Sequence, residues 1–373
     1  MSQTIKAMIV DDSALIRNLV TRELSKSESI EVVGTAMNGR FALNKISKLK
    51  PDIIILDLEM PEMNGIEFLR EKERLGINSP VIILSALAKK GAKITLEALE
   101  LGASDFILKP SEPGVNLADM GAQLIEMTLA LAKPNSYYEK ISQVSEPEIP
   151  SVIQRIKFDL GSMPELDVNK YLQPIASVPN IEIVSIGIST GGPNALREVL
   201  PKFPEDFPIP IVVVQHMPQG FTLEFANSLN KICKLPVKEA SDGDILKQGR
   251  VLIAPGNKHV KVKKKPLANV IELDESDPVN GHRPSADVLF ESVAETYGGS
   301  SIGCIMTGMG KDGAVQIGKI LKSGGVTIAQ DQSSSVVFGM PKVAIEKQNI
   351  QIVKPLDKIS ETIISLVLNK KII

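Results

Sequence analysis

The stretch Ile53-Ile54-Ile55-Leu56-Asp57 decides the fold of the first half of the chain. A continuous apolar run of this length predicts a strand that is buried on both faces, as in the middle of a parallel sheet. Segments with helical period, such as residues 15–24, separate this run from its neighbours. The neighbouring apolar runs are residues 7–10, 31–34, 81–84 and 106–108. This alternation predicts a doubly wound, flavodoxin-like α/β domain.

The second half of the chain repeats the alternation of strands and helices. Residues 260–273 differ, because their polar and apolar residues alternate as in an antiparallel hairpin at the edge of a sheet. The lysines at 261–265 are expected on the solvated edge of that hairpin. The apolar runs of this half are residues 182–188, 211–215, 251–254, 302–306 and 326–329. We therefore predict a second, Rossmann-like doubly wound domain with an antiparallel edge hairpin.

Six prolines interrupt the pattern between the two halves, at positions 134, 147, 150, 164, 174 and 179. We predict a first domain at residues 1–130, a linker at 131–180 and a second domain at 181–373. Residues 151–158 could form a short amphipathic helix, so we expect a linker that can dock onto a domain.

Composition excludes several classes of protein. The 373 residues carry 42 Lys and Arg against 44 Asp and Glu, and this near balance argues against nucleic acid as the main partner. The longest apolar runs are strand-sized, and the N-terminus has no secretory pattern, so we expect a cytoplasmic protein without membrane insertion. Cys233 and Cys304 are far apart in the sequence and are expected to be reduced packing residues. We expect a monomer.

Acidic residues follow two of the predicted strands in the first domain. Asp11 and Asp12 follow the first strand, and Asp57 ends the third. Because strand ends of an open α/β sheet meet at one edge, these carboxylates should converge, and they would repel one another without a cation. Oxygen ligands of this kind suit Mg²⁺. Ser85 and Lys109 end the fourth and fifth strands at the same edge.

These five residues resemble the pattern of the receiver domain of two-component response regulators over about residues 5–125. The resemblance implies that Asp57 accepts a phosphoryl group from a histidine kinase, and that Asp11 and Asp12 form the acidic pair. It also implies that Asp12, Asp57 and the carbonyl of Glu59 hold Mg²⁺. Ser85 matches the switch hydroxyl, Lys109 the phosphate-pairing lysine and Phe106 the rotating aromatic residue. Many members have Tyr at this last position, and Phe106 lacks that hydroxyl.

A candidate nucleophile follows the first strand of the second domain. Gly187-Ile188-Ser189-Thr190-Gly191 has the G-x-S-x-G pattern that exposes a serine at a turn between a strand and a helix. The same glycines could instead form a structural or phosphate-binding loop. A serine nucleophile needs a base, and the chain has three histidines, His216, His259 and His282. His216 is favoured because it directly follows the 211–215 strand at the edge where Ser189 emerges.

A carboxylate must orient the base, and two aspartates compete for this role. Asp312 follows the 302–306 strand on a glycine-rich loop, whereas Asp331 follows the next strand. Asp312 alone could be a helix cap. The order Ser, His, Asp differs from the Ser, Asp, His order of α/β-hydrolases, so that fold is excluded.

Several longer motifs surround these residues in the second half. They are Ile186-Gly187-Ile188-Ser189-Thr190-Gly191-Gly192-Pro193, Val214-Gln215-His216-Met217-Pro218, Ala254-Pro255-Gly256, Arg283-Pro284-Ser285-Ala286-Asp287-Val288-Leu289-Phe290, Met306-Thr307-Gly308-Met309-Gly310-Lys311-Asp312-Gly313 and Gln330-Asp331 through Gly339-Met340-Pro341. By these motifs the second half resembles the CheB family of chemotaxis protein-glutamate methylesterases over residues 181 to about 350.

The resemblance implies hydrolysis of glutamate γ-methyl esters on chemoreceptors with release of methanol, and deamidation of receptor glutamines in many members. It implies Ser189 as nucleophile, His216 as base and Asp312 as orienter. It also implies the Met309 backbone as oxyanion donor, Thr190 as a neighbouring site residue and no metal in this domain.

Two alternatives to a phosphorylation-activated esterase remain open from the sequence. The second domain could bind a receptor or another regulator without turnover, as a phosphorylation-switched interaction module. A DNA-binding output domain is disfavoured by the balanced charge and by the lack of a basic recognition helix in a small terminal module.

Overall fold

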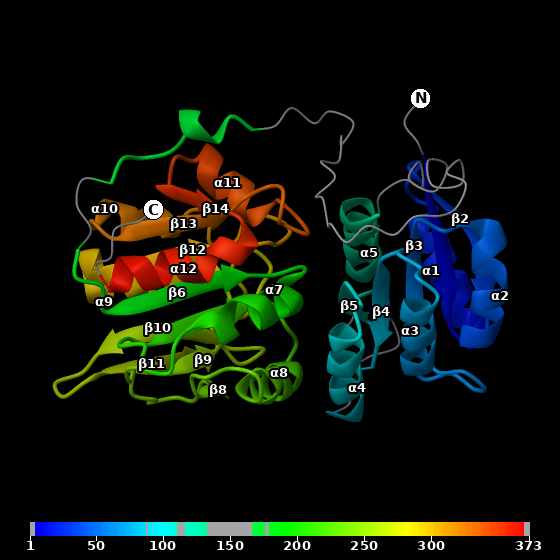
Figure 1. Cartoon of the computed structure of the whole chain (residues 1–373), viewed down its shortest axis with the longest axis horizontal. Coiled ribbons are helices and arrows are strands. Elements are labelled where there is room, and N and C mark those ends of the chain that lie inside the picture. The colour runs from blue at the N-terminus through cyan, green and yellow to red at the C-terminus, as the bar shows by residue number, and fades with distance from the viewer. Residues whose placement is uncertain (1–3, 87–88, 110–115, 133–165, 176–178, 369–373) are drawn as a thin grey trace, which may run out of the picture.

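The chain forms two parallel sheets, each with helices on both faces. The structure, a computed structural model, describes residues 4–86, 89–109, 116–132, 166–175 and 179–368. The two sheets belong to two lobes that lie side by side in Figure 1. The predicted doubly wound architecture of both halves is confirmed.

The first lobe has a five-stranded sheet with the order β2-β1-β3-β4-β5. All its strand pairs are parallel. The elements follow the chain as β1 (Ile5–Val10), α1 (Ala14–Leu24), β2 (Ile30–Ala36), α2 (Gly39–Leu49), β3 (Ile53–Asp57), α3 (Gly65–Arg74), β4 (Val81–Ser85), α4 (Lys89–Glu100), β5 (Asp105–Leu108) and α5 (Leu117–Leu131).

The central strand β3 is buried on both faces, as its apolar run predicts. Ile53 and Ile55 pack with apolar residues of α1 and α5. Ile54 and Leu56 face the other side of the sheet, in the cluster that contains residues of α2, α3 and α4. Full burial of each such side chain contributes about 1.5–3 kcal/mol, so this strand anchors the lobe.

The second lobe has a seven-stranded parallel sheet with the order β14-β13-β12-β6-β7-β9-β8. The sequence did not predict the edge strands β8 and β14, because each is a three-residue segment that includes charged residues. The elements of the sheet and its helices are β6 (Ile183–Ile188), α7 (Gly192–Val199), η2 (Leu200–Lys202), β7 (Ile211–Gln215), α8 (Phe221–Asn230), β8 (Val237–Glu239), β9 (Val251–Ile253), α9 (Ala286–Tyr297), η3 (Gly298–Ser300), β12 (Ser301–Ile305), α10 (Ile317–Lys322), β13 (Val326–Gln330), α11 (Met340–Glu346), β14 (Ile352–Lys354) and α12 (Leu356–Val367).

The predicted antiparallel hairpin consists of β10 (His259–Lys264) and β11 (Asn269–Asp274). It forms a two-stranded sheet of its own, and β10 packs against α9. Its lysines lie on the surface, where Lys263 forms an ion pair with Glu272 across the strands at 2.6 Å. The lysine cluster therefore has the solvated character that its sequence predicts.

The end of the predicted linker packs against the second lobe. Leu166 and Tyr171 lie on its apolar core, on either side of the short helix η1 (Val168–Lys170). The backbone N–H of Gln173 donates to the carbonyl of Ile350 at 2.9 Å. The helix predicted at 151–158 lies outside the described residues, and the bounds of the two domains and of the linker stay predictions.

The two lobes share one apolar cluster. Helix α4 of the first lobe contacts α7 and α8 of the second, and Figure 1 shows these helices facing one another. Phe106 on β5 stacks on Phe221 at the start of α8, with ring centroids 4.8 Å apart and planes 8° apart. The lobes are thus packed through side chains, and the first lobe meets the second by its β5 edge.

Two leucines, one on α8 and one in the turn of the hairpin, offer a matched test of how the core of the second lobe is packed. Leu229 is fully buried on α8, whereas Leu267 is fully exposed. We expect Leu229→Ala to lower the free energy of unfolding of the second lobe by about 2–5 kcal/mol, because it leaves a cavity. Leu267→Ala should stay within about 0.5 kcal/mol of the parent. Urea unfolding followed by circular dichroism measures both, and equal losses would contradict this packing.

Candidate active site and acidic cluster

Ser189 sits at a tight turn where β6 gives way to α7. Its backbone N–H donates to the carbonyl of Thr307 at 2.9 Å, and its own carbonyl accepts from Gly192 at 2.7 Å. A Cβ on Gly192 would lie 1.9 Å from the side-chain oxygen of Gln215, so the turn requires glycine there. Gln215 in turn donates to the carbonyls of Ser189 and His216. The turn is therefore held from the neighbouring strand β7.

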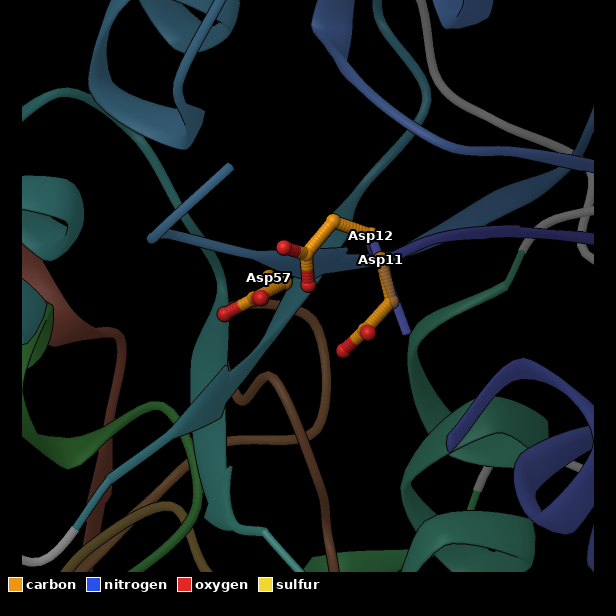
Figure 2. Close-up of side chains that lie close together, drawn as sticks. All are labelled: Asp11, Asp12 and Asp57. Carbon is orange, nitrogen blue, oxygen red and sulfur yellow. The ribbon is translucent and has the colours of Figure 1, made fainter. Parts of the chain in front are cut away.

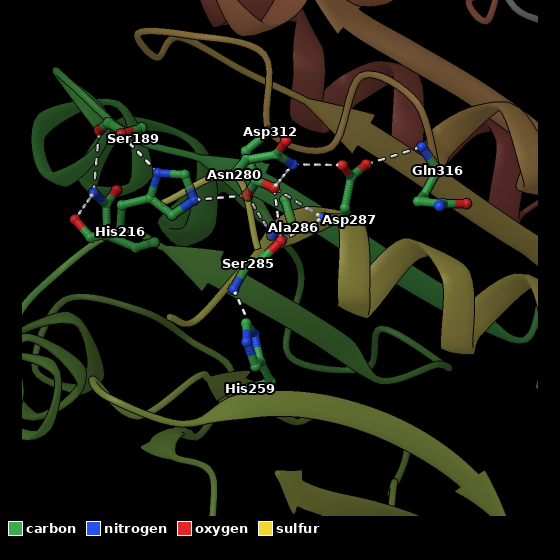
Figure 3. Close-up of polar contacts among 10 residues, drawn as sticks. Ser189, His216, His259, Asn280, Ser285, Ala286, Asp287, Asp312 and Gln316 are labelled. Atoms are coloured by element: carbon green, nitrogen blue, oxygen red, sulfur yellow. Dashed lines mark hydrogen bonds and ion pairs between the residues drawn. The ribbon is translucent and has the colours of Figure 1, made fainter. Parts of the chain in front are cut away.

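The structure brings Ser189, His216 and Asp312 into one hydrogen-bonded row (Figure 3). His216 Nδ1 lies 3.0 Å from Ser189 Oγ, and His216 Nε2 lies 2.8 Å from Asp312 Oδ2. Because a carboxylate can only accept, Nε2 carries the proton. Nδ1 then presents its lone pair to the serine hydroxyl, which is the arrangement a general base requires.

Asp312 is buried at the N-terminus of α9. Its carboxylate accepts from the hydroxyl of Ser285 at 2.6 Å, from the side-chain amide of Asn280 at 3.0 Å and from the backbone N–H of Ala286 at 2.6 Å. Burial alone would raise the pKa of Asp312, but the hydrogen bonds from His216, Ser285 and Asn280 outweigh it and hold that pKa well below its usual range. The orienting group therefore stays ionised.

The competing residues have other positions. His259 accepts from the backbone N–H of Ser285 at 3.2 Å and bonds the carbonyl of Asp277 at 3.1 Å, so it supports the segment that holds Asp312. His282 stacks on the ring of His216. Asp331 accepts from the backbone N–H of Ser334 in its own turn. The sequence did not single out Ser285 or Asn280, because their polar contacts arise only when the loops meet.

A cavity of about 390 Å³ opens onto Ser189 and His216. Thr190 and Met309, the two further site residues implied by the resemblance, line it. The carbonyl of Thr190 accepts from the hydroxyl of Thr307 at 2.9 Å, which fixes the turn beside the serine. The first lobe closes the other side of the cavity with residues of β5 and α5, among them Asp105, Phe106, Asn116, Asp119, Met120 and Gln123.

Asp11, Asp12 and Asp57 gather at the carboxyl edge of the first sheet, as predicted (Figure 2). One carboxylate oxygen from each lies within 4.8 Å of the others. Burial raises the pKa of Asp11 and of Asp57 above the usual value, although Lys109 opposes this effect. Two buried carboxylates with a third at their rim are a donor set that suits a hard divalent cation, so the residues present fit Mg²⁺.

The remaining residues of the predicted receiver site lie around the same cluster. Lys109 Nζ lies 2.7 Å from Asp57 Oδ2 and 3.3 Å from Asp11 Oδ2. The backbone N–H of Glu59 donates to Asp57 Oδ1 at 3.3 Å. Ser85 Oγ lies 2.5 Å from the hydroxyl of Thr95 on α4, beside a cavity of about 30 Å³ that Asp57 and Lys109 also line. Phe106 instead points to the second lobe, where it meets Phe221.

Polar contacts join the two lobes next to Ser189. Asp105 accepts from the backbone N–H of Gly191 at 3.0 Å, and Asn194 donates to the carbonyl of Ala103 at 3.0 Å. Arg197 forms an ion pair with Glu100 at 2.6 Å. Sequence reasoning missed Asp105, because an aspartate at the start of a strand has no local signal that distinguishes it from a turn residue. The first lobe thus bonds the turn that carries the candidate nucleophile.

Comparison with known proteins relates each half of the chain to a known family. A family model described as CheB methylesterase matches residues 184–363, and one described as response regulator receiver domain matches residues 7–119. A relative from Treponema denticola, named protein-glutamate methylesterase/protein-glutamine glutaminase, is 48% identical over 371 residues, with 97% of this chain and 98% of the relative covered. The chain belongs to the CheB methylesterase family. It is a hydrolase with a response regulator receiver domain.

Further members of the CheB family support this assignment. A relative of the same name from Pyrococcus horikoshii is 40% identical, with 98% of this chain and 95% of the relative covered. The crystal structure of the Thermotoga maritima CheB methylesterase catalytic domain matches with 46% identity and a TM-score of 0.50, covering 51% of this chain and all of that one. Among the described residues of this CheB family member, no helix has the length and apolarity to cross a membrane.

The buried carboxylate at the lobe interface predicts a pH-dependent contact. Burial raises the pKa of Asp105 to about 6, against the opposing hydrogen bonds from Phe106 and Gly191. An exposed Asp has a pKa of about 3.9, so the docked lobes bind the proton more tightly, and docking strengthens as the pH falls from above 6 towards 4. We expect the docking equilibrium to be roughly tenfold more favourable at pH 5 than at pH 7.5.

The protection factor of the Gly191 amide, from hydrogen exchange corrected for the intrinsic pH effect, measures this docking. Asp105→Asn should abolish the pH dependence, whereas Glu100→Gln at the exposed ion pair should preserve it. A protection factor that rises with pH would contradict the expected sign.

Proposed function

We propose that this chain hydrolyses glutamate γ-methyl esters on chemoreceptors, releasing methanol, and deamidates receptor glutamines in the same site. The observation that carries the proposal is the row Ser189, His216 and Asp312, which opens onto a cavity. The names of the relatives supply protein glutamate esters and protein glutamines as the substrate class, and the family resemblance supplies the chemoreceptor as the protein that carries them. We expect the protein to act as a monomer in the cytoplasm.

In this proposal Ser189 Oγ attacks the ester carbonyl while His216 Nδ1 takes the hydroxyl proton. The ionised Asp312 stabilises the imidazolium that forms. Backbone N–H groups near Met309 and Thr190 are the proposed donors to the oxyanion. His216 then returns the proton to the departing methoxide, so methanol leaves and a glutamyl ester of Ser189 remains. Water, deprotonated by His216, attacks that ester. Its bond to Ser189 Oγ then breaks, His216 returns the proton to that oxygen, and the glutamate carboxylate is released. With a glutamine substrate the leaving molecule is ammonia.

The receiver domain controls this site in the proposal, with a histidine kinase as the phosphodonor and Asp57 as the acceptor. Asp11, Asp12, Asp57 and the carbonyl of Glu59 would hold Mg²⁺, which when bound would neutralise the clustered negative charge. The catalytic domain needs no metal for the serine chemistry. Lys109, already 2.7 Å from Asp57, would pair with the phosphoryl oxygens.

Four contacts connect the acceptor site to the cavity. A phosphoryl group on Asp57 adds roughly 1.5–2 negative charges beside Ser85 and Lys109. Movement of Ser85 towards that charge would break its bond to Thr95 and shift α4, which contacts α7 and α8. The same shift strains the Phe106 stack on Phe221. We infer that phosphorylation loosens these contacts and opens the cavity to the receptor helix.

Replacement of the nucleophile tests the enzymatic half of the proposal. We expect Ser189→Ala to lower kcat for methanol release from methylated receptor by about 10⁴ to 10⁶, because the attacking oxygen is lost. Ser241→Ala, at an exposed serine, is the matched control and should keep the parent rate. If Ser189→Ala keeps the cellular effect of the protein, it acts as an adaptor without turnover and the hydrolytic assignment is wrong.

Replacement of the phosphoacceptor tests the regulatory half. A small phosphodonor such as acetyl phosphate should raise methanol release by the parent chain but not by Asp57→Asn. Asp206→Asn, an exposed acid of the second lobe, should respond like the parent. Equal rates with and without the phosphodonor in the parent would refute control by phosphorylation, whereas no methanol in either state would refute the enzymatic half.

A further inference from the structure

One tight turn delivers two side chains to the candidate triad. Val279 and His282 exchange backbone hydrogen bonds of 3.1 and 3.0 Å across Asn280 and Gly281. Both central residues have positive φ, 53° and 80°, a combination that favours Asn followed by Gly. Asn280 donates to Asp312 at 3.0 Å and to Asp287 at 2.7 Å. The turn then returns the chain so that His282 reaches His216.

The rings of His282 and His216 stack face to face. Their centroids are 3.8 Å apart and their planes differ by 10°. The hydrogen bonds to Ser189 and Asp312 belong to His216, so within the described residues His282 meets the row through its ring face. His282 also lines the cavity and is therefore next to the bound substrate in the proposed reaction.

Two physical effects follow from this stack. Hydrogen bonds at Nδ1 and Nε2 fix two atoms of the His216 ring, but the ring could still rotate about the line between these two nitrogens. A second ring packed against its face prevents that rotation. Two neutral rings prefer an offset or an edge-to-face arrangement, whereas a cation over an aromatic face is attracted to it. The near-parallel stack therefore favours the state in which His216 is positively charged and His282 is neutral.

His282 is neutral at the pH at which the base must work. Burial and, to a smaller extent, the neighbouring His216 together lower the pKa of His282 to about 4, although Asp312 opposes this. A second charge beside the imidazolium is thereby avoided.

We propose that His282 is a positioning residue of the hydrolytic reaction, whose ring holds the His216 imidazole between Ser189 and Asp312 and stabilises the imidazolium formed when Ser189 loses its proton. This inference rests on the proposed function. It gives a role to the one histidine of the three that neither serves as the base nor supports the backbone of Ser285.

Two substitutions separate the aromatic face from simple bulk. His282→Phe keeps a flat ring at this position, and His282→Leu keeps apolar volume without one. With phosphodonor present and methylated receptor as substrate, we expect His282→Phe to retain kcat within about threefold. His282→Leu should lose about tenfold in kcat, which corresponds to about 1.4 kcal/mol of transition-state stabilisation, with KM changed less than twofold.

The pH profile distinguishes positioning from a general loss of structure. An aromatic face stabilises the imidazolium, so the acid limb of kcat/KM should lie at lower pH in His282→Leu than in His282→Phe. Other titratable and charged groups also surround His216: Asp312, which bonds its Nε2, and Asp105, Asp119 and Arg283, which line the cavity. These groups are the same in both variants, so they do not contribute to the difference.

The possible results decide the matter. Methanol release by the parent chain tests the proposed function. If the parent releases no methanol, the proposed function is wrong, and the role of His282 falls with it. Given an active parent, equal kcat for the parent and a folded His282→Leu refutes positioning. A folded His282→Phe as slow as His282→Leu also refutes it, because a ring nitrogen would then be required. Near-UV circular dichroism and the thermal midpoint establish folding.

A measurement on the parent chain covers the case in which the variants do not fold. Nitrogen-15 spectra of the histidine side chains should show a ring, assigned to His282, that stays neutral down to at least pH 5. The titratable groups that face it are His216 and Asp312. A His282 ring that becomes charged near pH 6.5 would overturn the proposal.

Discussion

The site depends on one buried carboxylate, Asp312, held at the N-terminus of α9 by a hydroxyl, an amide and backbone N–H groups. A buried charge is costly unless such donors compensate it, and here they keep it ionised although burial opposes this. The charge then selects the His216 tautomer that offers a lone pair to Ser189. Replacement of Ser285 or Asn280 would therefore disturb the orientation of His216, although neither residue supplies the hydrogen bonds of its ring.

The same logic of burial governs the contact between the lobes. The cavity in front of Ser189 is lined by residues of both lobes, so any movement of the first lobe would change access to that serine. The interface combines an aromatic stack with a carboxylate that bonds the turn after the serine. The aromatic stack buries apolar surface between the lobes, while the buried charge of Asp105 weakens the contact at neutral pH. Such a balanced interface is suited to a switch, because a modest free energy can shift it.

Sequence reasoning succeeded where local pattern and strand topology suffice. The apolar runs located the central strands, and the rule that parallel strands end at one edge placed Asp11 beside Asp57 and His216 beside Ser189. It failed for β8 and β14, because these three-residue strands include charged residues and so lack the continuous apolar run that marked the equally short β9. It also left Asp105 and Asn280 unnoticed, because their partners are distant in the sequence. The resemblance to two families indicated the chemistry from sequence motifs alone.

The amino-acid order by itself determined two parallel sheets and the residue types at their carboxyl edges, since burial on two faces and strand-end chemistry are encoded within a few residues. Only the tertiary structure decided the donors that Ser285 and Asn280 supply to Asp312, the placement of His282 on the ring of His216, and the burial of Asp105 against Gly191. These are meetings of side chains from separate loops. Their geometry depends on how whole elements pack, and no local pattern in the chain specifies it.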